Sequence, residues 1–135
     1  MMEAVTMNRE QLLNWVRTQY GTQPEYLWPD SPDSAVLRGG NGKWYGIFMR
    51  VSRARLGLSG PGDADILNVK CDPALVDALR TQPGFLPAYH MNKRHWISIL
   101  LDGTVPEEDL LDLLSASHRI TIPKNKLRPR AERET

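Results

Sequence analysis

The order of helix-like and strand-like segments along the chain limits the folds that it can adopt. Apolar residues recur at spacings of three and four in three segments, which predicts helices at residues 6–21, 73–82 and 104–118. Strands are predicted first as a hairpin around the turn GGNG and then singly, at residues 35–51, 66–70 and 95–101. Because the strands come in a run rather than alternating strictly with helices, this order favours an α+β domain. Its helices would pack on one face of a mainly antiparallel sheet.

The ends of two predicted helices carry capping signals. Asn8 or Thr6 can accept a hydrogen bond at the start of the first helix, and Gly21 can adopt the left-handed conformation that ends it. Thr104 and Glu107 have the spacing of a capping box at the start of the third helix. Both helices therefore have local signals in addition to an apolar face.

Length and composition predict one globular domain, which we place at residues 1–120 of the 135, followed by a basic C-terminal tail at 121–135. Hydrophobic residues make up 41% and charged residues 24%, which is typical of a folded protein rather than a disordered one. Cys71 is the one cysteine, so an internal disulfide is excluded. The chain lacks both an apolar run of roughly 18 residues and a signal-peptide pattern, so we expect a soluble cytoplasmic protein.

The motif YHMNKRHW at residues 89–96 contains two histidines, an asparagine, a lysine, an arginine and a tryptophan within eight residues. A net charge of +1 provides no overall field for nucleic acid, so such a partner would need a local patch of this kind. The candidate nucleic-acid contacts are His90, Asn92, Lys93, Arg94 and His95, joined by Lys70 if its strand end lies nearby. Alternatively, the motif is a solvated lead-in from the irregular segment 83–94 to the next strand. Trp96 would be its packing anchor in either case.

Metal binding and catalysis are weakly indicated. His90 and His95 are five residues apart, a spacing that aligns them on neither a helix nor a strand, and no nearby Cys or Glu completes a metal site. Cys71 could act as a nucleophile only with a base and an exposed, electropositive setting, whereas a single cysteine beside a core strand is usually a small buried hydrophobe. We therefore expect no metal, no cofactor and no enzymatic activity.

Two further groups of residues could contribute to binding. A second basic run contains Arg50, Arg53 and Arg55, which can bind phosphate or form a solvated edge, and the tail adds Lys124, Lys126, Arg128 and Arg130. A small-molecule pocket could be lined by Tyr26, Trp28, Tyr89 and His90. The sequence thus predicts a binding module, monomeric or homodimeric, with DNA as the first candidate partner. A chaperone-like adaptor for a protein partner is the alternative.

Three motifs within residues 67–118 are distinctive in combination, LNVKCDP, YHMNKRHW and LDGTVPEEDLLDLL, with weaker support from PEYLWPD and GKWYGIF. In these motifs the chain resembles the MmcQ/YjbR family of small bacterial proteins. It implies a compact α+β fold similar to that of secretion chaperones, and family members are commonly described as DNA-binding. The sequence departs from the family at His118, where a tyrosine is usual, and after residue 119, where nothing matches.

Overall fold

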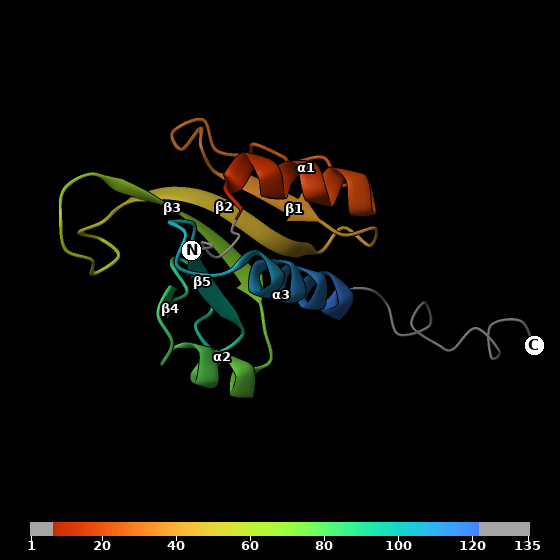
Figure 1. Ribbon diagram of the computed structural model, residues 1–135. Coiled ribbons are helices and arrows are strands. Elements are labelled where there is room, and N and C mark those ends of the chain that lie inside the picture. The colour runs from red at the N-terminus through yellow and green to blue at the C-terminus, as the bar shows by residue number, and fades with distance from the viewer. Residues whose placement is uncertain (1–6, 122–135) are drawn as a thin grey trace, which may run out of the picture.

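A five-stranded antiparallel sheet runs through the part of the chain that the computed structural model describes, residues 7–121 (Figure 1). The elements are α1 (Arg9–Tyr20), β1 (Ala35–Arg38), β2 (Trp44–Ser52), β3 (Asp63–Lys70), α2 (Pro73–Leu79), β4 (Phe85–Pro87), β5 (Trp96–Leu100) and α3 (Glu107–Ile120). The spatial order of the strands is β1-β2-β3-β5-β4, and every neighbouring pair is antiparallel. The predicted α+β class is therefore confirmed.

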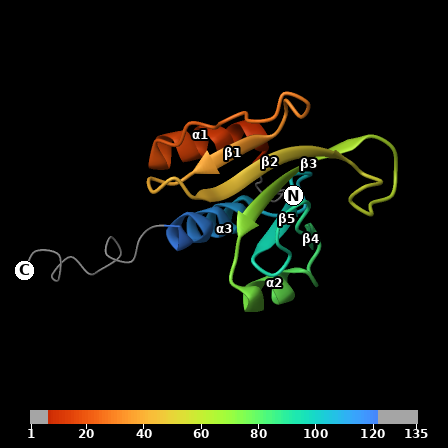
Figure 2. The same ribbon diagram turned by 180° about the vertical axis from the view of Figure 1, so that it is seen from behind.

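All three helices bury their apolar side chains against the same face of the sheet. Their buried residues belong to one core with alternate strand residues, which include Phe48, Leu67, Val69, Ile97 and Ile99. The strand residues between these, among them Val51, Ala64, Ile66 and Leu100, form a smaller cluster on the other face. Figure 2 shows the molecule turned so that this second face can be followed. We call the two surfaces the helix-covered face and the open face.

The predicted caps are correct for α1 and wrong for α3. Asn8 forms a capping box with Gln11, and Gly21 ends α1 with a left-handed φ of 69°. In contrast, α3 begins after Pro106, which supplies no side-chain cap, and the Thr104 N–H is instead bonded to Asp102 Oδ1 at 3.0 Å. The capping box predicted from Thr104 and Glu107 does not form, because the Asp102 side chain binds the Thr104 N–H and keeps Thr104 in the turn before the helix.

Strand pairing extends or creates elements that local sequence did not predict. β3 starts at Asp63 rather than residue 66, because its first residues pair with the end of β2, where Ser52 lies opposite Asp63. β4 forms inside the segment predicted to be irregular, because Phe85 pairs with Ile99 of β5. Three residues are too few to show the alternation of a strand, so pairing with β5 determines that this segment is extended.

α3 ends two residues later than the helix predicted at residues 104–118. α3 continues to Ile120, and Thr121 is buried, with its backbone carbonyl accepting a hydrogen bond from the Asn41 side chain. The rest of the predicted tail, residues 122–135, lies outside the described residues. The helix therefore continues beyond residue 118, where the sequence predicted its end.

His118 occupies an aromatic environment. Its imidazole stacks on Tyr20, with ring centroids 3.7 Å apart and planes 8° apart, and it meets the Tyr45 ring edge-on at 4.9 Å. The Tyr45 hydroxyl is bonded to the Thr22 hydroxyl at 2.5 Å. Desolvation by burial lowers the pKa of His118 and raises the pKa of Tyr45 to about 12. A flat ring at position 118 thus ties α3 to α1 and β2.

A candidate binding groove on the open face

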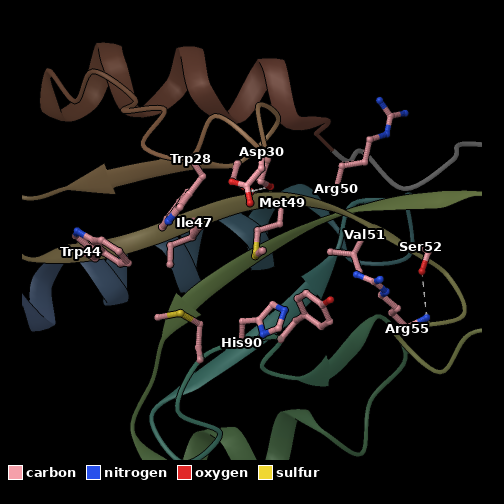
Figure 3. A pocket seen from close by; sticks show the side chains of 14 residues that line it. Trp28, Asp30, Trp44, Ile47, Met49, Arg50, Val51, Ser52, Arg55 and His90 are labelled. Atoms are coloured by element: carbon pink, nitrogen blue, oxygen red, sulfur yellow. Dashed lines mark hydrogen bonds between the residues drawn. The ribbon is translucent and has the colours of Figure 1, made fainter.

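A groove of about 710 Å³ lies on the open face along β2 (Figure 3). Its floor is apolar, because Ile47, Met49 and Val51 alternate along the strand and point to this side. One wall comes from the connection before β1, the other from the segment between β4 and β5. The groove therefore joins three parts of the chain that are far apart in the sequence.

Two tryptophans form one end of the groove. Trp28 and Trp44 are half-buried and meet edge to face, with ring centroids 5.9 Å apart and planes 90° apart. The guanidinium of Arg38 lies over the Trp44 ring, 5.7 Å from its centroid. A β-bulge between Leu37 and Arg38 accompanies this arrangement, since Arg38 pairs with Trp44 and leaves Tyr45 unopposed. Tyr45 packs among the helices while Trp44 lines the groove.

The opposite wall is held by a buried polar network under Tyr89 and His90. Asn68 of β3 donates from Nδ2 to the Tyr89 carbonyl at 3.3 Å, and the Tyr89 N–H donates to Ser98 Oγ at 3.0 Å. The Ser98 hydroxyl also donates to Asn68 Oδ1, and both side chains are fully buried. These hydrogen bonds fix the backbone of Tyr89, where the segment between β4 and β5 crosses the open face.

His90 has an unusual backbone conformation beside this network. With φ at 58°, it is the one residue other than glycine with a positive φ among residues 7–121. Its ring lies against Tyr89, with centroids 4.1 Å apart, and Figure 3 shows it beside the groove floor. Such a conformation persists only where the surroundings determine it, and it is frequent at binding sites.

Arg55 closes the groove at the far end from the tryptophans. It belongs to the β2–β3 connection, which is braced by the bond from Arg53 Nε to the Ser59 carbonyl at 2.7 Å. The Arg55 N–H is bonded to Ser52 Oγ at 3.3 Å, and Figure 3 shows its side chain extending past Val51 toward the groove. The Arg53 side chain thus stabilises the loop, while the Arg55 side chain lines the groove and can contact a ligand.

A second, smaller hollow of about 350 Å³ adjoins the groove and shares Arg55, Tyr89 and His90 with it. Lys93 also lines this hollow. One cation of the second basic run, Arg55, and one of the YHMNKRHW motif, Lys93, therefore approach the same surface. The sequence identified these two groups separately, without evidence that they meet.

Two other charged residues, Arg50 and Asp30, line the groove. Arg50 contributes to the lining, but Figure 3 shows its guanidinium extending away from His90, and its Nε lies 3.9 Å from Asp65. Asp30 is the acidic residue of the lining. With Arg55 and nearby Lys93 opposed by this single carboxylate, the groove favours an anion.

The predicted contact residues separate into two sets. His90 lines the groove and Lys93 the adjoining hollow, whereas Asn92, Arg94, His95 and Lys70 line neither. The Asn92 side chain accepts from the Arg94 N–H at 2.9 Å, so it shapes the turn. Lys70 lies opposite Trp96 at the end of the β3–β5 ladder.

The aromatic residues named from the sequence agree only in part with their predicted positions. Trp96 is 8% exposed, which confirms it as a packing anchor. Trp28 and Tyr89 line the groove, together with His90, as expected of a pocket, but Tyr26 is 56% exposed and borders a different hollow. Trp44 was missed as a site residue, because within a strand its ring could not be told from a core side chain.

Cysteine and metal chemistry gain no structural support. Cys71 is 4% exposed, and burial, with a smaller contribution from Asp72, raises the pKa of its thiol to about 11. A neutral, enclosed thiol is a packing group. Within residues 7–121, no three His, Cys, Asp or Glu side chains are placed to hold a metal ion, and no helix is long and apolar enough to cross a membrane.

The fold and the groove define a class of protein: an α+β domain whose antiparallel sheet carries helices on one face and a lined groove on the other. The YjbR family model matches residues 17–120. The chain therefore belongs to the YjbR family, as its sequence motifs predicted.

Relatives and solved structures agree with this assignment. The chain is 46% identical to the uncharacterized protein YyaQ of Bacillus subtilis over 85% of its own length and 98% of that protein. It is 34% identical to uncharacterized YbdF of Escherichia coli O157:H7, over 73% and 72% of the two chains. A crystal structure from Pseudomonas syringae has a TM-score of 0.84 and 38% identity, covering 86% of this chain and all of that one. Deinococcus radiodurans protein DR2400, with a DUF419 domain, has a TM-score of 0.69 and 25% identity over 98% and 90% of the chains.

Proposed function

We propose that this YjbR-family protein is a non-enzymatic binding module that contacts DNA through the groove on its open face. Arg55 and Lys93 would bind phosphate oxygens, and His90 would add a ring and a hydrogen-bonding edge. The cytoplasmic location expected from the sequence is part of this proposal.

The observation that carries the proposal is the convergence of cations and aromatic rings on one surface. Arg55, Tyr89 and His90 line both the groove and the adjoining hollow, where Lys93 joins them, and Trp28 and Trp44 lie at the groove's other end. Proteins that bind nucleic acid combine these two kinds of group, because phosphates attract cations and bases stack on rings.

The protein-adaptor alternative has less support. Among residues 7–121, the exposed large apolar side chains are Tyr26, Leu27, Leu75 and Ile120, and they come from three separate segments. A partner-binding surface usually gathers such residues into one patch. The groove, in contrast, gathers its polar and aromatic residues from three segments into one place.

The test is fluorescence anisotropy with labelled duplex and single-stranded DNA across a salt series. We expect affinity to fall steeply between about 50 and 200 mM salt, because phosphate contacts release counterions. The double variant Arg55→Ala/Lys93→Ala should bind more weakly and with a salt slope reduced by about two, one for each lost phosphate contact.

A matched control removes the same charge elsewhere. Arg17 and Arg80 are exposed on α1 and at the end of α2, and neither lines the groove. The variant Arg17→Ala/Arg80→Ala should stay within about twofold of wild type if the site is local. Equal losses in both double variants, salt-independent affinity, or no binding by folded protein at low salt would each refute the proposal. In the last case a search for a protein partner follows.

A further inference from the structure

We infer that the groove is built for unpaired bases, so that single-stranded nucleic acid is the preferred ligand over duplex. This inference rests on the proposed function and specifies its substrate class. It follows from the shape of the site, the geometry of the two tryptophans and the distribution of charge along β2.

The shape of the site opposes duplex recognition. Sequence reading in a duplex requires a helix or a β-ribbon that protrudes into the major groove, which is roughly 12 Å wide. The cations here border a hollow of about 710 Å³ whose floor is a strand face. A hollow of this kind admits a splayed base, whereas a duplex presents only its backbone to it.

The two tryptophans at the end of the groove suit base stacking. Their perpendicular packing leaves them half-buried, unlike Trp96, which is enclosed. With the Arg38 guanidinium 5.7 Å from the Trp44 centroid, that ring is braced in place. A base that stacks on such a braced ring gains affinity without sequence preference, because every base has a flat face.

Charge and rings are separated along the groove. From Trp44 to Val51, β2 spans about 23 Å at roughly 3.3 Å per residue. The two tryptophans lie at one end and Arg55 lies at the other, as Figure 3 shows, with Lys93 in the adjoining hollow. This distribution matches an extended strand that places bases on the rings and phosphates against the cations.

The experiment compares three DNA probes of about 12 nucleotides in anisotropy titrations at low salt: a single strand, the duplex of the same sequence, and an abasic single strand of equal charge. A further titration competes the single strand with its own mononucleotides. We expect the single strand to bind about tenfold more tightly than either the duplex or the abasic strand. Mononucleotides should compete weakly, because they lack the span of the groove.

Variants identify the rings that produce this preference. Trp44→Ala and Trp28→Ala should each reduce single-strand affinity about tenfold, and should reduce duplex affinity by a smaller factor, because paired bases cannot stack on the rings. Tyr26→Ala is the matched control, since it removes an exposed ring outside the groove. Trp44→Leu serves as a second variant if Trp44→Ala does not fold, as judged by circular dichroism.

The outcomes separate this inference from the function on which it rests. Salt-sensitive duplex binding equal to or tighter than single-strand binding, or abasic binding equal to that of the intact strand, overturns the inference and leaves the proposed function intact. Absence of binding to every probe overturns both. Tight competition by mononucleotides also overturns the inference of single-strand preference, because the site would then hold a small nucleotide.

Discussion

The two faces of the sheet are built from the same strands but differ in composition. On the helix-covered face, alternate residues such as Phe48, Leu67 and Ile99 join one continuous apolar core with all three helices. On the open face, the intervening residues form a smaller cluster that includes Ile66 and surrounds fully buried Asn68. No helix of residues 7–121 contributes to that cluster, and loops reach over it instead.

The comparison teaches how one sheet can separate stability from binding. Because side chains alternate along a strand, apolar residues on one face can support the fold while their neighbours are free to shape a groove. The polar pair Asn68 and Ser98 illustrates the division, since it satisfies the backbone of Tyr89 rather than adding apolar area. If this division is correct, substitutions on the two faces should have different consequences.

The largest expected effect is on the helix-covered face. Phe48→Ala should lower the free energy of unfolding by about 3–5 kcal/mol, because it empties a fully buried site in the main core. Met49→Ala, one residue along on the open face and half-buried, should cost about 1 kcal/mol. Urea denaturation measures both, and equal costs would contradict the division between the faces.

An intermediate effect is expected from the polar network. Asn68→Ala should cost about 1–3 kcal/mol, because it leaves the Tyr89 carbonyl without its partner, and it should also weaken the proposed DNA binding by releasing His90. Ser98→Ala disturbs the same network, so the double variant should lose less than the sum of the two. Additive losses in a double-mutant cycle would show that the two side chains act independently.

The smallest effect concerns pH and the aromatic contacts of His118. Burial lowers its pKa in the folded protein, so the unfolded chain binds the proton more readily. This contribution to stability is present above the ordinary histidine pKa near 6.5 and is lost as the pH falls below it. Urea midpoints between about pH 5 and 7.5 should therefore fall with acidity.

The control for this pH effect is His118→Tyr, which keeps a flat ring against Tyr20 and Tyr45 but does not titrate in that range. The slope of stability against pH should be shallower in this variant than in the wild type. An unchanged slope would assign the acid sensitivity to other groups.

The helices and most strands could be predicted from sequence because their signals are local. The capping box at Asn8 and the left-handed Gly21 depend on a few neighbouring residues, and both are confirmed. β4 could not be predicted, because Phe85–Pro87 becomes a strand only through pairing with β5. The capping box expected at Thr104 failed because Asp102 binds the same N–H.

The candidate site shows the same limit. From sequence, His90 and Lys93 were named in one hypothesis, Arg55 in a second, and Trp28, again with His90, in a third. Nothing local states that the connection before β1, the β2–β3 loop and the segment after β4 meet on one face. Trp44 went unnoticed because alternation along a strand does not reveal which of its two faces is covered.

By itself, the sequence determined the α+β class, the YjbR relationship, the positions of the main helices and the residue types available for binding. These follow from periodicity, capping and motifs, which are encoded over short stretches of chain. Only the tertiary structure decided which face the helices cover, where α3 ends, and that Arg55 and His90 border one groove. Those features depend on contacts between residues far apart in the chain, which form only when burial of one sheet face fixes the register of all five strands.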